Sequence, residues 1–221
     1  LLRGLQTDRE KALALLDWTH RQWQHNGDNE PSRPDALTIL AEARTGRRFR
    51  CVEYATVLTS ALQAVGYRAR SAALKTKDVE TARSGAGHVL VETWLPQFSK
   101  WVLLDGQYNV MPEAAGVPLN AVELGEALQQ RRAFGLFNQA GEVRGANRTV
   151  YLFFIARYLY YLDVAFDNRE PAPIDPILRV NGKTRLMLVP LGAPRPAVFQ
   201  GMYPLDDLYF SNSVRDFYAN P

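Results

Sequence analysis

The sequence predicts a mixed α+β fold, because helical and extended patterns occupy separate stretches of the chain. Before residue 67, apolar residues recur at intervals of three and four, as on one face of an amphipathic helix. From Tyr67 to Asp105 the pattern changes to short runs rich in β-branched and aromatic residues, which are typical of strands. Successive strands with short connections favour antiparallel pairing. We therefore expect N-terminal helices followed by an antiparallel sheet.

Three helices are predicted in the N-terminal part. The first spans Asp8 to His25 and ends at Asn26-Gly27. The second spans Asp35 to Ala43, with the Asp35 side chain as N-cap. The third begins at Cys51 and ends at Gly66, a residue that favours helix C-termini.

The strands of the predicted sheet follow at once. Tyr67 to Lys75, His88 to Leu95 and Trp101 to Asp105 have strand-like composition. The last two are separated by five residues that begin with Pro96, so they are expected to form a hairpin.

The second half of the chain is less regular. A helix is predicted over Ala121 to Arg131 and a strand over Lys183 to Pro190, while the aromatic region from Tyr151 onward is ambiguous between the two. Prolines crowd the last third. We expect a core over residues 1–135 and, over residues 136–221, a C-terminal extension packed on that core.

Composition excludes several classes of protein. The chain has 221 residues, with 26 Lys+Arg against 23 Asp+Glu, a balance too even to indicate nucleic acid. One cysteine and three histidines provide neither a disulfide framework nor a metal centre, and no cofactor motif is present. The most apolar stretch is interrupted by Arg157 and Asp163, so no membrane span is expected. A secreted or periplasmic location follows if a signal peptide precedes Leu1; localisation and oligomeric state stay open.

Cys51 is the candidate nucleophile. It is predicted at the first turn of the third helix, where unpaired N–H groups and the helix dipole favour a negative charge. The thiolate is the reactive form of cysteine. Arg47, Arg48 and Arg50 precede it and are expected to add positive potential. A lone cysteine is often only a small buried residue, so this prediction depends on a neighbouring base.

His88 is the candidate base and Asp105 its candidate orienting group, as a cysteine nucleophile requires. His20 and His25 lie near the end of the first helix and are predicted as surface residues. A hairpin turn centred just after Pro96 would place His88 directly opposite Asp105. Residues opposed in this way have Cβ atoms about 4.5–5.5 Å apart.

Three blocks of the sequence resemble the transglutaminase-like core. They are Arg50-Cys51-Val52-Glu53-Tyr54-Ala55, Gly87-His88-Val89-Leu90-Val91-Glu92-Thr93-Trp94 and Lys100-Trp101-Val102-Leu103-Leu104-Asp105. The resemblance covers Asp8 to about Arg131 and implies a papain-like fold, with Cys51 as nucleophile, His88 as base and acid, and Asp105 as orienter. The Asp-Pro pair common in that family is here Asp105-Gly106, which is expected to alter the loop.

The implied function is cysteine-dependent acyl transfer on an amide bond of a peptide or protein, cell-wall peptides included. Hydrolysis (peptidase or amidase) and transfer to an amine (protein-glutamine acyltransferase) both stay open. The Cys51 N–H would be one oxyanion donor, and Gln22 or Trp23 are candidates for the second, although both fit ordinary helix surface and core. Calcium is used by eukaryotic members, but no acidic cluster here demands it.

Two other functions stay open. An arylamine N-acetyltransferase-like enzyme shares the order of the triad and the Cys51-Val52-Glu53 pattern, although its usual Arg-Gly-Gly is absent here. A non-catalytic binding scaffold of the same fold is the other, and the presence of all three triad residues disfavours it.

Overall fold

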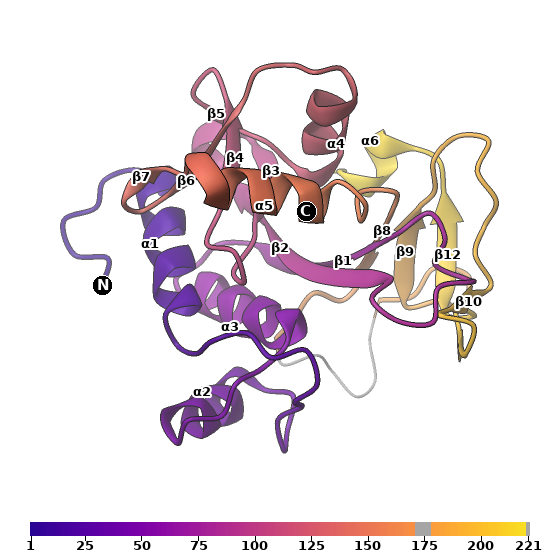
Figure 1. Ribbon diagram of the computed structural model, residues 1–221, viewed down its shortest axis with the longest axis horizontal. Coiled ribbons are helices and arrows are strands. Elements are labelled where there is room, and N and C mark those ends of the chain that lie inside the picture. The colour runs from indigo at the N-terminus through magenta and orange to yellow at the C-terminus, as the bar shows by residue number, and fades with distance from the viewer. Residues whose placement is uncertain (171–177, 220–221) are drawn as a thin grey trace.

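The computed structural model describes residues 1–170 and 178–219, which form a mixed α+β fold (Figure 1). The helices are α1 (Asp8–His20), α2 (Ala36–Arg44), α3 (Cys51–Ala64), α4 (Ala121–Gln129), α5 (Gly145–Ile155) and α6 (Val214–Phe217), with a 3-10 turn at Pro96–Phe98. The strands are β1 (Ala69–Lys75), β2 (Gly87–Leu95), β3 (Lys100–Leu104), β4 (Met111–Ala114), β5 (Val117–Pro118), β6 (Gly135–Asn138), β7 (Gly141–Glu142), β8 (Tyr161–Ala165), β9 (Arg185–Leu188), β10 (Val198–Phe199), β11 (Tyr203–Pro204) and β12 (Leu208–Ser211).

The largest sheet has the strand order β12-β9-β8-β1-β2-β3. All its neighbours pair antiparallel except β12 and β9, which are parallel. The strands β5, β4, β6 and β7 form a second sheet, and β10 and β11 form a separate hairpin. The expected antiparallel sheet is thus confirmed, and it extends beyond the three strands predicted from the sequence.

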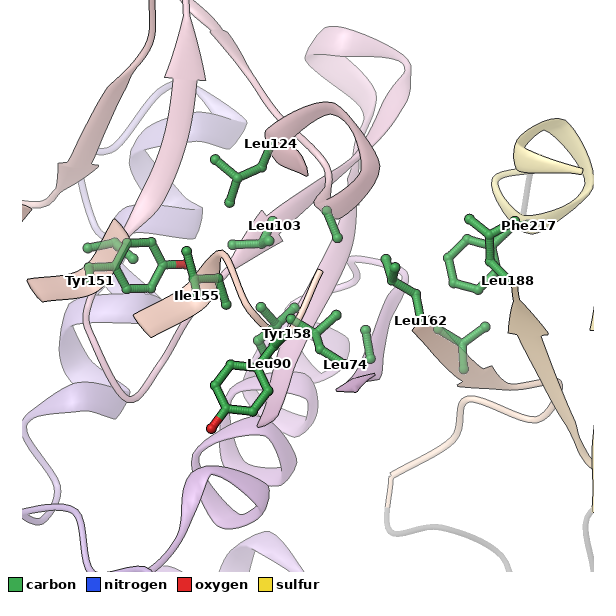
Figure 2. Close-up of a cluster of buried hydrophobic side chains, with 14 of the residues drawn as sticks. Leu74, Leu90, Leu103, Leu124, Tyr151, Ile155, Tyr158, Leu162, Leu188 and Phe217 are labelled. Carbon is green, nitrogen blue, oxygen red and sulfur yellow. The ribbon is translucent and has the colours of Figure 1, made fainter. Parts of the chain in front are cut away.

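Helices cover both faces of the large sheet. Because side chains alternate along a strand, Val91 and Leu90 of β2 belong to different buried clusters: Val91 packs with α1 and α3, and Leu90 with α4 and α5. Figure 2 shows the second cluster, in which Tyr151 and Ile155 of α5 lie over the sheet. The site described below lies where α3, α5 and the ends of β2 and β3 meet.

The helix starts follow from their caps, but the first helix ends early. The Asp35 side chain accepts from the Thr38 N–H, as predicted. Helix α1 stops at His20 instead of His25, so the predicted end was wrong. The chain turns away after His20 because the Trp23 side chain packs against Phe49. The Trp23 carbonyl also accepts a hydrogen bond from the Tyr54 hydroxyl. Packing therefore outweighs a helical pattern that is weak beyond residue 20.

The β2–β3 hairpin has a different connection from the predicted one. The ladder closes at the pair Leu95–Lys100, which leaves four residues in the loop. These form the 3-10 turn Pro96–Phe98 followed by Ser99, which adopts a left-handed backbone with φ 51°. The turn is therefore centred one residue later than expected.

This shift moves the pairing by two residues, and the predicted opposition of His88 and Asp105 was wrong. The last ladder pair is Val91–Leu104, so Asp105 lies one step beyond it, diagonal to His88. Two residues are one full period of a strand, so His88 and Asp105 still project from the same face. Their side chains meet despite the error in register.

The ambiguous aromatic region contains both kinds of structure. Residues 145–155 form α5 and residues 161–165 form β8, which pairs with β1. The predicted strand over Lys183 to Pro190 is confirmed as β9. Strands from the C-terminal third thus continue the sheet of the N-terminal half; the division into a core and an extension at residue 135 stays a prediction.

The helices of the described residues are all too short or too polar to cross a lipid bilayer.

Candidate active site

Cys51 is the first residue of α3, as predicted, and its side chain is half-buried. The start of the helix is held by Glu53, whose carboxylate accepts from the Arg50 N–H at 3.0 Å and from the Arg50 guanidinium. The backbone N–H groups of a first helical turn have no partner within the helix, and they form the positive end of the helix dipole. The Cys51 thiol lies at this end of α3.

The arginines before Cys51 contribute less positive potential than the sequence suggests. Arg50 forms ion pairs with Glu30 and Glu53, and Arg47 with Glu42. Each pair offsets the charge of its guanidinium. The electrostatic environment of the thiol therefore depends mainly on the helix dipole and on the nearby imidazole.

His88 lies at the start of β2 and is 1% exposed. Its Nε2 is 2.8 Å from Oδ2 of Asp105, which is fully buried. The Cys51 side chain lies close enough to the same imidazole to raise its pKa. The three residues singled out from the sequence therefore lie in one contiguous group.

Asp105 is oriented by its own turn. Its N–H donates to the Val110 carbonyl at 2.9 Å, and its Oδ1 accepts from the N–H groups of Gln107 and Tyr108. One carboxylate oxygen is thus satisfied by backbone and the other is left for His88. Such a carboxylate holds an imidazole in one tautomer and one orientation.

Gly106 allows this turn to lie against the nucleophile helix. A Cβ at this position would stand 3.3 Å from Cβ of Tyr54 on α3. The Gly106 carbonyl also lies 3.2 Å from Nδ1 of His20. The departure from the family's Asp-Pro pair therefore coincides with close contact between the Asp105 turn and α3.

His88 and Asp105 are the main charges among the three candidate residues Cys51, His88 and Asp105. Burial lowers the pKa of the His88 imidazole, but the Asp105 carboxylate and the contact with Cys51 outweigh burial and raise that pKa to about 10. The imidazole is consequently protonated at neutral pH. A buried imidazolium beside a thiol is the electrostatic arrangement that favours thiolate.

An aromatic wall from α5 and its C-terminal turn encloses His88. The Phe154 ring meets the imidazole edge-on at 5.0 Å between centroids, and Tyr158 lies at 5.8 Å. Tyr151 is almost completely buried, and its hydroxyl has no hydrogen-bond partner within the described part of the chain. Burial and the nearby Asp105 charge raise the Tyr151 pKa. The helical spacing of these aromatics was visible in the sequence, but nothing there linked them to His88.

The other two histidines are closer to this group than predicted. His20 is half-buried and stacks on Tyr54, so its assignment to the surface was wrong. His25 is exposed, as expected, and its pKa is lowered by partial burial and then by the charge of His88.

The two oxyanion-donor candidates occupy different environments. The Gln22 side-chain amide donates to the Trp18 carbonyl at 2.7 Å. The Trp23 indole packs against Phe49 and Tyr54, and its Nε1 is buried without a partner in residues 1–170 and 178–219. Over the same residues there is no group of three or more His, Cys, Asp and Glu side chains placed to hold a metal ion.

Comparison with known families agrees with this geometry. The model of the transglutaminase-like superfamily matches residues 1–106, which contain α1 to β3 and extend one residue past Asp105. The match covers just under half of the chain and is to the family that the resemblance implied. These residues have the mixed α+β arrangement that the resemblance implied, with a cysteine at the start of a helix beside an antiparallel sheet.

Two solved structures share distant similarity with the chain. One, from Cytophaga hutchinsonii, is called a "Putative Cysteine Protease"; it has 17% identity and a TM-score of 0.39, and the match covers 47% of this chain. The chain spans only 33% of that protein. The other is calcium-bound LapG from Legionella pneumophila, with 11% identity, a TM-score of 0.36 and coverage of 62% of this chain and 72% of LapG. No curated protein matches the chain.

Proposed function

We propose that this protein is a cysteine-dependent enzyme that transfers the acyl group of an amide bond, with Cys51 as nucleophile, His88 as base and acid, and Asp105 as orienter. The observation that carries the proposal is the buried hydrogen bond between His88 and Asp105, at 2.8 Å, beside the thiol at the start of α3. The match of residues 1–106 to the model of the transglutaminase-like superfamily supports it.

The chemistry follows from the positions of the three side chains. The Cys51 thiolate attacks the amide carbonyl carbon, and the C–N bond breaks as the His88 imidazolium gives its proton to the leaving amine. The free N–H groups at the start of α3 are positioned to stabilise the oxyanion. The acyl group then passes from Cys51 to water or to an amine: neutral His88 takes the proton of the acceptor, and the C–S bond breaks to release the Cys51 thiolate.

A peptide or protein is the proposed substrate class, because similarity to the transglutaminase-like superfamily implies acyl transfer from an amide bond. Hydrolysis would make the protein a peptidase or amidase, and transfer to a lysine-like amine a protein-glutamine acyltransferase. The similarity to LapG and to the Cytophaga hutchinsonii protein does not distinguish hydrolysis from transfer.

Alkylation of Cys51 by iodoacetamide tests the activated thiol directly, since the chain has one cysteine. We expect wild type to react about tenfold faster or more than His88→Ala near neutral pH, because the imidazolium that stabilises thiolate is lost. His25→Ala is the matched control, and its rate should stay within about twofold of wild type because that side chain is exposed. Mass spectrometry would measure the rates.

Equal alkylation rates in wild type and His88→Ala would overturn the proposal. The remaining function would then be a binding scaffold of the same fold. Should the thiol be activated, incubation with acetyl-coenzyme A and an arylamine would test the acetyltransferase alternative against amide substrates.

A further inference from the structure

The oxyanion of the proposed reaction has backbone donors at the start of α3 but no side-chain donor so far. When Cys51 attacks an amide carbonyl, the negative charge that develops on the oxygen is stabilised by hydrogen-bond donors already in place. The Gln22 amide is engaged by the Trp18 carbonyl at 2.7 Å. The Trp23 indole N–H is sealed from solvent. Neither Gln22 nor Trp23 therefore meets a substrate oxygen in this arrangement.

Tyr108 belongs to the turn that holds Asp105. Its backbone N–H donates to Oδ1 of Asp105 at 3.2 Å. Its ring lies edge-on to the His88 imidazole, with 6.3 Å between the ring centroids. The charge of the Cys51 thiolate contributes to raising the pKa of its hydroxyl. Tyr108 therefore lies beside all three residues of the candidate triad.

Exposure separates the residues of this group that a substrate can touch from those that it cannot. His88 and Asp105 are buried, whereas Cys51 and Tyr108 are half-buried. In residues 1–170 and 178–219, no hydrogen bond engages the Tyr108 hydroxyl, and this oxygen is not sealed from solvent. The Tyr108 O–H is thus an unused donor that a substrate can reach.

The two tyrosines of the aromatic wall do not offer such a donor. The Tyr158 hydroxyl donates to the Gly85 carbonyl at 3.0 Å and accepts from the Arg157 guanidinium at 2.7 Å. The Tyr151 hydroxyl is completely buried. Of these tyrosines and Tyr108, only Tyr108 combines an unused hydroxyl with access to solvent.

The Tyr108 hydroxyl is held in place and keeps its proton. Its ring packs against the rings of Phe154 and Tyr151, with 4.8 Å and 5.2 Å between centroids. Burial and then the charge of Asp105 are the main causes that raise the Tyr108 pKa to about 12, so the hydroxyl is protonated at neutral pH. A donor fixed before the reaction costs no reorganisation when charge develops.

We propose that the Tyr108 hydroxyl donates a hydrogen bond to the oxyanion that forms when Cys51 attacks the substrate carbonyl. The inference rests on the proposed function and adds a catalytic residue to it. Tyr108 lies beyond residue 106, where the match to the superfamily model ends.

The step is balanced without a proton from Tyr108. The Cys51 sulfur forms a C–S bond as the second electron pair of the C=O bond moves onto the oxygen, where the Tyr108 O–H binds it. The C=O bond then re-forms while the C–N bond breaks and His88 protonates the leaving amine. Tyr108 stabilises the charge and keeps its own proton throughout.

Two reactions of the same thiol test this role, because only one of them passes through an oxyanion. Iodoacetamide alkylates Cys51 by displacing iodide, whereas p-nitrophenyl acetate acylates it through a tetrahedral intermediate. We expect Tyr108→Phe to slow acylation by about tenfold or more, since removal of one oxyanion donor costs about 10²–10³ in rate, and to leave alkylation within about twofold of wild type. Release of p-nitrophenolate in a single turnover measures acylation, and mass spectrometry measures alkylation.

Tyr209→Phe is the matched control. It removes the same hydroxyl from β12, at the opposite edge of the large sheet from β3, so both rates should equal those of wild type. Tyr108→Phe removes a hydroxyl that has no hydrogen bond in the described residues, so we expect it to fold. Thermal unfolding checks this for each variant.

The outcomes distinguish the role of Tyr108 from the proposed function. Unchanged acylation in Tyr108→Phe would overturn the inference. An equal loss in acylation and alkylation would overturn it too, because Tyr108 would then act on the thiol and not on the oxyanion. Equal alkylation of wild type and His88→Ala would instead contradict the proposed function, on which the inference rests.

Discussion

At the scale of single residues, the unusual group is the His88 imidazole, which combines burial with a positive charge. Burial alone would favour the neutral ring. The Asp105 carboxylate at 2.8 Å reverses this preference and raises the pKa from 6.5 to about 10. The carboxylate therefore has two effects: it orients the ring and it maintains the charge that the thiol faces.

The raised pKa of His88 makes stability depend on pH. Because the folded protein holds this proton more tightly than the unfolded chain, the contribution is fully present below about pH 6.5 and is lost as pH rises through about 10. We expect Asp105→Asn to lose of the order of 2 kcal/mol of unfolding free energy near neutral pH and to show a flatter decline toward alkaline pH. Urea unfolding across that range measures both.

A parallel pH profile for wild type and Asp105→Asn would contradict this account. His88→Gln is a useful companion, because it removes the titrating group itself. The unfolding free energy of His88→Gln should also show no decline at alkaline pH. A variant of an exposed histidine, such as His25, should show the same decline as wild type.

At the scale of elements, α3 and the turn after β3 are held together by close backbone approach. Gly106 has no left-handed backbone, so its lack of a side chain matters for space and not for conformation. The Tyr54 Cβ and carbonyl and the Leu58 Cδ2 would all meet a Cβ placed there. The relative position of Cys51 and Asp105 therefore depends on a glycine.

Gly106→Ala is expected to destabilise the protein by about 1–3 kcal/mol, since an added methyl group forces α3 and the Asp105 turn apart. The alkylation rate of Cys51 should fall with it, because the imidazole loses its alignment. Thermal unfolding and iodoacetamide labelling measure the two effects.

Gly125→Ala is the control for that substitution. Gly125 lies inside α4, and a Cβ there makes only an ordinary contact, 3.7 Å from Leu159. Alanine favours helix over glycine by about 0.5–1 kcal/mol, so this variant should be more stable than wild type and equally reactive. A Gly106→Ala protein with the stability and reactivity of wild type would show that the contact is not limiting.

At the scale of the whole molecule, one buried cluster joins the two halves of the chain. It contains Leu74 and Leu90 of the N-terminal half together with Ile155, Leu162 and Phe217 of the C-terminal part (Figure 2). Strand β8 also pairs with β1 in the middle of the sheet. The N-terminal half therefore shares its core with residues beyond 135.

A fragment of residues 1–135 is consequently expected not to fold cooperatively. It would leave the β1 edge unpaired and expose one side of the sheet, and such surfaces favour aggregation. Circular dichroism and thermal unfolding of the fragment check this. A soluble fragment with a cooperative transition would instead support an independent core at that boundary.

The C-terminal helix is anchored by a buried ion pair. Arg70 and Glu92 pair at 2.8 Å, with the Arg70 guanidinium 4.8 Å from the Phe217 ring centroid and the Tyr218 hydroxyl on Glu92 at 2.6 Å. Arg70→Met should destabilise the protein by about 3–5 kcal/mol, because it leaves a buried carboxylate unpaired.

The double variant Arg70→Met with Glu92→Met should recover much of that loss, since neither charge is then left alone. Unfolding free energies of the four proteins form the double-mutant cycle. A double variant no more stable than Arg70→Met would show that the pair is not the source of the effect.

The sequence by itself determined the local features of this protein. Cys51 begins α3 and Asp35 caps α2 because capping and glycine stops act within a few residues. The match of residues 1–106 to the superfamily model was also predictable. So was the proximity of His88 to Asp105, because strand alternation preserves the face of each side chain even when the register is misjudged.

Only the tertiary structure decided the rest. The left-handed Ser99 set the hairpin register, and packing of Trp23 ended α1. The aromatic wall over His88 and the ion pairs of Lys75 and Arg185 with Asp163 come from segments far apart in the chain. Such contacts depend on how the helices pack against the sheet, and no local pattern of residues predicts that packing.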